Sequence, residues 1–238
     1  MIQPRDNRGL DTRNELAPRP LTMPCRALVF PEGLEASGSR LSHRRVVGPA
    51  PELNPPGESA RVAGVRARSR IRRYATTNRL DALVTITAAI LLPPLQFAQR
   101  IRHLIRRCTR KLGPVPWLWV AELGSKSGRF HVHMMSRASE ADWLAESWTA
   151  GAVDVRFLAT IEDIRATAHY LAKTFHEPPI LAHRYYLSRR FNPQPLVVEA
   201  ATLFDLLDLV EQRIGWPPTE VRNIERGASF SAFWQEAA

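Results

Sequence analysis

The feature that most constrains the fold is a pair of histidines, His131 and His133, separated by one residue in a strand-like segment. Side chains alternate across a β-strand, so both imidazoles point to the same face. Residues 117–122 have the composition of a preceding strand, and the loop between the two strands contains two glycines, two serines and two cations. We therefore expect a β-hairpin in which Glu122 lies opposite His131. Val120 then falls opposite His133.

In this register one carboxylate and two imidazoles share a face of the sheet, which is the arrangement that a divalent-metal site requires. A slip of one residue would move Glu122 to the other face. The alternative for the histidine pair alone is two half-buried strand histidines that hydrogen-bond to the backbone. Motifs further along the chain favour the metal site.

The net charge of the chain limits the kinds of partner that it can bind. The 238 residues carry a formal net charge of +10, which indicates a polyanionic partner, nucleic acid before an acidic membrane. No apolar run is long enough to cross a membrane, and no signal-peptide pattern occurs, so we expect a soluble, cytoplasmic protein. The two cysteines are far apart and lack metal-type spacing, which predicts reduced thiols.

The N-terminal third differs from the rest of the chain. Residues 1–79 contain 15 arginines, 7 acidic residues and 9 prolines, with almost no apolar periodicity. Such a segment buries too little apolar surface to offset its chain entropy, so we expect residues 1–76 to be a disordered basic region. Its last part, residues 61–73, is a basic arm that either contacts phosphates or is a solvated tail, or sequence upstream of the true start codon.

From about residue 80 the hydrophobic pattern predicts strands and helices. Residues 80–87 form a β-branched strand, and apolar residues then recur at three- and four-residue intervals from Phe97 to Leu112. The opposite face of this second segment is basic, and it is either solvated or in contact with nucleic acid. A short helix capped at Ser139 and an alternating strand at 152–157 follow.

The next helix is capped at Thr160 and extends to about Phe175. Tyr170 and Lys173 lie opposite its apolar stripe, three residues apart and therefore adjacent. A phenol can attack a phosphodiester if a metal polarises the phosphate and an ammonium stabilises the charge. Lys173, one of only three lysines, is suited to that role, and the alternative is an ordinary surface tyrosine. We expect His169 to be either a surface histidine or one that hydrogen-bonds through its N–H.

The order of these motifs resembles the HUH endonucleases and, more narrowly, rolling-circle replication initiator (Rep) proteins of bacterial plasmids and phages. The resemblance covers about residues 75–200. It departs from the family after Lys173, where an aromatic residue and a second lysine often follow, and the third metal ligand varies among these proteins. The motifs that carry it are Thr-Ile-Thr at 85–87, Glu122, Gly-Arg-Phe-His-Val-His at 128–133, Trp143, Trp148 and Gly151, Tyr-Leu-Ala-Lys at 170–173 and the segment 183–189.

The resemblance implies an α+β fold with a central antiparallel sheet, a ferredoxin-like variant, and packed helices over residues 77–198. Residues 199–238 would form a C-terminal helical extension. His131, His133 and Glu122 would hold Mg²⁺ or Mn²⁺. Tyr170 would nick one strand of origin DNA in the bacterial cytoplasm, leaving a 5′-phosphotyrosine link and a 3′-OH primer.

The partners implied are single-stranded or hairpin origin DNA, a host polymerase and, because the sequence lacks a Walker-type loop, a host helicase. Within the same fold, a transposase or a mobilisation relaxase is the alternative. A non-catalytic DNA-binding protein and a metal-dependent small-molecule enzyme are the others. The last of these accounts neither for the charge nor for the tyrosine–lysine pair.

Five residues are candidates for DNA contact through phosphate binding or base stacking: Arg129, Arg184, Tyr185, Arg189 and Arg190. Tyr185 and Tyr186 are also rival nucleophiles, and packing at a domain edge is the alternative for their segment. The amphipathic helix that begins at Leu203 either belongs to the fold or forms the face of a homodimer. We expect the aromatic residues at 230–234 to dock on the core.

Overall fold

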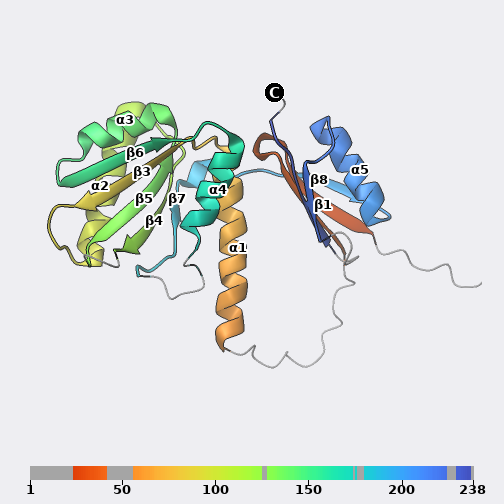
Figure 1. Cartoon of the computed structure of the whole chain (residues 1–238), viewed down its shortest axis with the longest axis horizontal. Coiled ribbons are helices and arrows are strands. Elements are labelled where there is room, and N and C mark those ends of the chain that lie inside the picture. Colours follow the sequence, from red (N-terminus) through yellow and green to blue (C-terminus); the bar gives the residue numbers. More distant parts are fainter. Residues whose placement is uncertain are drawn as a thin grey trace, which may run out of the picture.

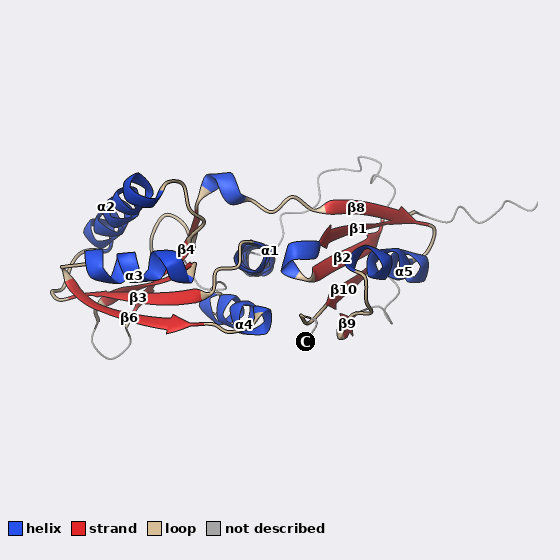
Figure 2. Ribbon diagram, turned by 90° about the horizontal axis from the view of Figure 1, so that it is seen from above, coloured by secondary structure: helices blue, strands red, loops and turns tan. Residues whose placement is uncertain are grey.

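The computed structural model describes residues 24–41, 56–124, 128–173, 175, 180–223 and 229–236. Within these residues the chain forms two five-stranded antiparallel sheets and five α-helices, which confirms the α+β class. The two sheets lie side by side along the long axis of the molecule, and α1 (Pro56–Thr77) stands between them (Figures 1 and 2). Among the described helices, none is long and apolar enough to cross a membrane.

The first sheet contains both candidate histidines and is called the histidine sheet below. Its neighbouring strands are all antiparallel, and each predicted strand is found within two residues of its expected position. In spatial order its strands are β6 (Gly151–Phe157), β3 (Ala82–Ala88), β5 (Phe130–Ser136), β4 (Leu118–Leu123) and β7 (Tyr186–Leu187).

Two helices, α2 (Pro94–Leu112) and α3 (Ala138–Ser147), cover one face of the histidine sheet (Figure 2). The apolar residues predicted for α2 are buried there, apart from Leu112 at the end of the helix. The predicted cap at Ser139 is wrong, because α3 already begins at Ala138. The carboxylate of Asp81 accepts a hydrogen bond from the Ala138 backbone N–H at 2.6 Å, so a distant acidic residue satisfies this helix end.

The opposite face of the histidine sheet packs against α1 and α4 (Ile161–Leu171). Thr160 and Asp163 form the capping box that starts α4, as predicted. The apolar stripe predicted for this helix is fully buried. Most of it contacts the part of the sheet around Leu118 and Met135, whereas Ile161 packs in the core of the second sheet. Because α4 has only three turns, it leaves the far end of this face partly open.

The second sheet joins the two ends of the chain and is called the terminal sheet. Helix α5 (Leu203–Ile214) packs on one of its faces through Leu203, Leu206 and Val210. The aromatic residues near the C-terminus dock on the same core, as expected. In spatial order its strands are β8 (Leu196–Ala200), β1 (Cys25–Phe30), β2 (Glu35–Arg40), β10 (Ser229–Phe233) and β9 (Glu220–Arg222).

The terminal sheet corrects two expectations from the sequence. Disorder over residues 1–76 is wrong for β1, β2 and α1, although residues 1–23 and 42–55 lie outside the described residues. Residues 199–238 contain not only a helix but also β9 and the strand β10. The reason is non-local pairing: β1 finds one partner in β8, more than 160 residues away along the chain, so no local pattern reveals its burial.

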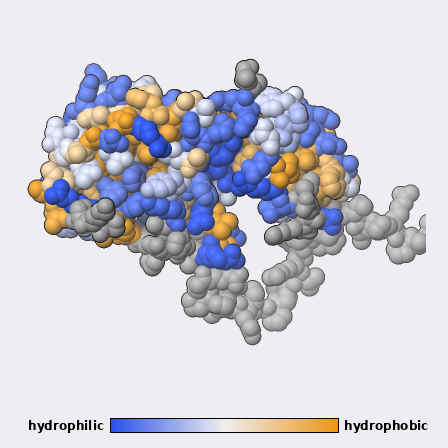
Figure 3. All heavy atoms as spheres, viewed as in Figure 1, coloured by the Kyte–Doolittle hydropathy of each residue, from blue (hydrophilic) through white to orange (hydrophobic). Residues whose placement is uncertain are grey.

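A buried carboxylate connects α1 to the terminal sheet. Glu35 of β2 is fully buried and accepts hydrogen bonds from Arg72, at 2.7 and 2.9 Å, and from Arg73, at 2.9 Å. Burial raises the pKa of this carboxyl, but the hydrogen bonds and charges of the two guanidinium groups outweigh it, and the net pKa is lowered. Figure 3 shows hydrophilic residues on the surface over α4 and the boundary with the terminal sheet. Beneath that surface the ion pairs of Glu35 stand beside apolar packing, since Ile161 of α4 is buried in the core of the terminal sheet.

We predict that Glu35→Ala lowers the free energy of unfolding by about 3 kcal/mol, because it leaves two half-buried guanidinium groups without their carboxylate. Urea denaturation at neutral pH measures this loss. The contribution of Glu35 is present above the ordinary carboxyl pKa and disappears as the pH falls through its lowered folded-state pKa, so the difference from wild type shrinks in acid.

Glu199→Ala is the matched control, since it removes an exposed ion pair with Arg26 in the same sheet. We expect it to cost less than about 1 kcal/mol. Equal losses for the two variants would contradict a structural role for the buried carboxylate.

Candidate active site

The register of the β4–β5 hairpin is the one predicted. Glu122 lies opposite His131, and Val120 lies opposite His133. On the other side of β5, Thr85 of β3 lies opposite His133. These pairings put Glu122, His131 and His133 on the face of the histidine sheet that α4 covers only in part, and all three are half-buried.

The three side chains converge closely enough to hold a metal ion. The Oε2 atom of Glu122 lies 3.4 Å from Nε2 of His133 and 4.0 Å from Nε2 of His131. The two imidazole rings meet edge to face, with their centroids 4.9 Å apart. Among the described residues, this is the one group of three or more potential ligands whose donor atoms lie within 4.8 Å of one another.

Thr85 orients one of these ligands. Its Oγ1 atom lies 3.1 Å from Nδ1 of His133. In the tautomer whose Nδ1–H donates to Thr85, the lone pair of Nε2 faces Glu122 and is available to a metal. Burial, followed by the charge of His131, lowers the pKa of His133, which favours the neutral imidazole that coordinates metals. Two imidazoles and a carboxylate therefore fit a divalent cation.

Tyr170 and Lys173 join the cluster from the end of α4. This helix ends at Leu171, earlier than predicted, and Lys173 lies in the turn that follows. Lys173 Nζ donates a hydrogen bond to the Tyr170 hydroxyl at 2.9 Å and lies 3.0 Å from Glu122 Oε1. The ammonium therefore links the phenol to the carboxylate of the cluster, a contact that the spacing of the motifs did not reveal.

The environment of this pair suits an exposed reactive group. Tyr170 is 53% exposed and lies off the buried stripe of α4, as predicted. The hydrogen bond with Tyr170, helped by the charge of Glu122, raises the pKa of Lys173, so the side chain is an ammonium at neutral pH. The neighbouring His169 is exposed as well, in agreement with the first of the two alternatives expected for it.

The residues predicted to bind DNA fall into two groups. Arg184 donates to the backbone oxygen of Phe175 at 2.7 Å, and Tyr185 stacks on the Phe175 ring. Both are half-buried, so packing accounts for their positions. Arg129 in the hairpin and the pair Arg189–Arg190 are exposed, and their contacts with DNA stay predictions.

Tyr186, the other rival nucleophile, is also used in packing. Its ring stacks on Trp119 with the centroids 4.0 Å apart. Because Trp119 belongs to the core under α2, the Tyr186 ring lies on the face of the sheet opposite to the histidine cluster. Tyr170 is therefore the tyrosine that lies next to the candidate metal ligands.

A carboxylate and two histidines on an antiparallel sheet, with a tyrosine–lysine pair beside them, are the constellation expected for HUH-type enzymes. Residues 82–178 match the model of a family described as replication-associated proteins. This match is consistent with a rolling-circle replication initiator of the HUH type and confirms the resemblance drawn from the motifs. The matched segment runs from β3 to just beyond α4 and contains the whole cluster.

Comparison with curated proteins and with solved structures gives no match.

We predict that Thr85→Val lowers the affinity for Mn²⁺ by about 10- to 100-fold, because it removes the hydrogen bond that fixes His133 while preserving the shape of the side chain. Isothermal titration calorimetry measures the change. Thr87→Val is the matched control, since Thr87 lies on the same face of β3 and makes no side-chain hydrogen bond within the described chain. An affinity that is unaltered by Thr85→Val would contradict the orienting role.

Proposed function

We propose that this protein initiates rolling-circle replication by nicking one strand of origin DNA with Tyr170. The observation that carries the proposal is the connection from the phenol, through the ammonium of Lys173, to Glu122 of the histidine cluster. An ordinary surface tyrosine is not expected to be linked to a candidate metal ligand in this way. The family match supports a role in replication, and the net charge of +10 suits a DNA substrate.

His131, His133 and Glu122 are the proposed ligands of Mg²⁺ or Mn²⁺. When bound, such an ion supplies charge stabilisation at the oxygens of the scissile phosphate. The half-open face beside α4 gives a single strand access to the cluster, whereas duplex DNA would have to be unpaired first. We therefore expect the substrate to be single-stranded DNA or the exposed loop of a hairpin.

Lys173 acts on the attacking oxygen in the proposed reaction. Its ammonium donates a hydrogen bond to the Tyr170 oxygen and stabilises the negative charge that develops there as the phenol proton leaves to solvent through the exposed side of the ring. The phenolate oxygen then attacks phosphorus, forming the phosphotyrosine bond and breaking the bond to the 3′ oxygen. The 3′ oxygen takes a proton from solvent and becomes the free hydroxyl that primes synthesis, for a host polymerase that follows a host helicase.

We predict that Tyr170→Phe reduces cleavage of single-stranded origin DNA in the presence of Mn²⁺ by at least about 10³-fold and abolishes the covalent protein–DNA adduct, because it removes the attacking oxygen. Denaturing electrophoresis of labelled DNA detects both products. Mass spectrometry of the adduct identifies the modified residue.

The rival tyrosines provide the controls. Tyr185→Phe and Tyr186→Phe also remove one hydroxyl each, from side chains that are packed against Phe175 and Trp119. We expect both variants to cleave within a few-fold of wild type. Equal activity of wild type and Tyr170→Phe would overturn the proposal, as would the complete absence of an adduct from wild type.

We predict that Lys173→Met lowers the cleavage rate by about 10²-fold, because the charge that stabilises the phenolate is lost. Lys173 also competes for Glu122 with any bound cation, so the affinity for Mn²⁺ should stay the same or rise. Calorimetry and single-turnover cleavage separate the two effects. A parallel fall in metal affinity and rate would instead indicate that Lys173 only supports the fold of the cluster.

A further inference from the structure

The outer face of α2 concentrates positive charge. The helix contains six arginine and lysine residues and no aspartate or glutamate. Its inner face is packed against the histidine sheet, so all six cations project outward. Within the part of the chain that the structure describes, no carboxylate pairs with Arg100, Arg102 or Arg106. Charge of this density, with no carboxylate on the helix to offset it, calls for an external polyanion.

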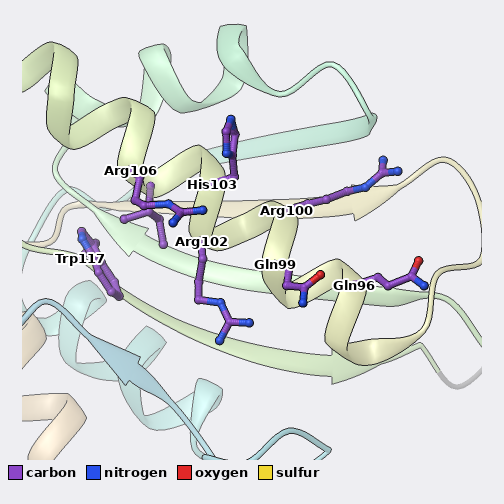
Figure 4. A pocket seen from close by; sticks show the side chains of 8 residues that line it. Gln96, Gln99, Arg100, Arg102, His103, Arg106 and Trp117 are labelled. Atoms are coloured by element: carbon purple, nitrogen blue, oxygen red, sulfur yellow. The ribbon is translucent and has the colours of Figure 1, made fainter.

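This face borders a hollow of about 980 Å³ between α2 and the chain entering β4. Gln99, Arg102 and Arg106 lie at helical spacing along one side of α2, and Trp117 faces the helix from the other wall (Figure 4). The three side chains on the helix span about 10 Å along its axis. Duplex DNA presents about one negative charge per 1.7 Å, so a row of this length faces several phosphates.

The hollow is separate from the candidate active site. Helix α2 packs over Val132 and Met134 of β5, whereas His131 and His133 point to the opposite face of that strand. A DNA strand that reaches the cluster therefore cannot reach α2 without passing around the edge of the sheet. The two surfaces are placed to hold two different parts of one DNA molecule.

The chemistry of the face favours a double helix over a single strand. Proteins that bind single strands offer exposed aromatic rings on which bases stack. The exposed side of α2 has no phenylalanine, tyrosine or tryptophan ring, and Trp117 at the opposite wall is half-buried. Arginine and glutamine side chains instead suit phosphate oxygens and the edges of paired bases.

We propose that the outer face of α2 and the adjoining hollow form a second DNA-binding site, which holds the phosphate backbone of the duplex that flanks the cleaved single strand. The choice of DNA as the polyanion rests on the proposed function. Binding itself requires neither the metal nor Tyr170. The site would fix the protein on the origin while the opposite face of the sheet acts on the exposed strand.

The test compares Arg102→Gln/Arg106→Gln with Arg26→Gln/Arg213→Gln. Both double variants remove two positive charges from exposed arginines, the first pair on α2 and the second on the terminal sheet and α5. Glutamine has nearly the helix propensity of arginine, so the fold of α2 should persist. Fluorescence anisotropy measures the binding of a short duplex and of a single strand of the same length over a range of salt concentrations.

We expect the α2 variant to bind the duplex at least about 10-fold more weakly at physiological salt. The slope of the logarithm of its binding constant against the logarithm of the salt concentration should be smaller in magnitude by about two. The control should lose less than about 3-fold by the same measure. Mn²⁺-dependent cleavage of a short single strand should be equal for the α2 variant and wild type. This pattern would support a duplex site on α2 that is separate from the chemistry.

Equal losses for the two double variants would reduce the effect to net charge and overturn the proposal. A greater loss for the single strand than for the duplex would overturn the assignment of partner. If wild type forms no adduct, the proposed nicking function fails, but the duplex titrations still decide whether α2 binds DNA.

Discussion

The pairing register between β4 and β5 is the constraint on which the candidate site depends. Side chains in a strand alternate with a period of two, so one step of slippage would turn Glu122 away from His131 and His133. The apolar residues on the other face hold the register, since a slip of β4 would turn Trp119 out of the core that it shares with Val132 beneath α2. The free energy that folds the sheet is therefore also the free energy that assembles the cluster.

The second requirement is the length of α4. Its buried stripe fixes the helix on the sheet, and its short extent leaves the histidines uncovered. The helix ends at Leu171, one residue after Tyr170, so the last turn carries the phenol and the following turn carries Lys173. In that turn the ammonium bridges Tyr170 and Glu122.

Much of the histidine sheet and its cluster could be predicted from the sequence because the relevant contacts are local or periodic. His131 and Glu122 are joined by a single hairpin, and α4 is indicated by its cap and its apolar stripe. The bond between Thr85 and His133 could not be predicted, because it depends on which strand becomes the second neighbour of β5. The alternating Thr-Ile-Thr segment at 85–87 did indicate that both threonine side chains share one face of their strand, which is the face of the histidines in the sheet.

The terminal sheet escaped prediction for a related reason. Its N-terminal strands are short and contain small residues, such as Ala27 and Gly38, so their composition suggests a loop. Gly38 is required by packing, because a Cβ at this position would collide with the ring of Phe230 on β10. Gly38, the residue that makes β2 resemble a loop, is thus the residue that allows β10 to pair with β2. Its partner Phe230 lies near the other end of the chain.

The arginines of the N-terminal region were misjudged in the same way. High positive charge with few apolar residues is the composition of a disordered tail, yet Arg72 and Arg73 project from an ordered helix toward Glu35. A carboxylate that is fully buried would be strongly unfavourable without them, so the two arginines are part of the core of the junction. The arginines of the described chain therefore include two that a buried carboxylate neutralises and those on the exposed face of α2, for which DNA is the proposed partner.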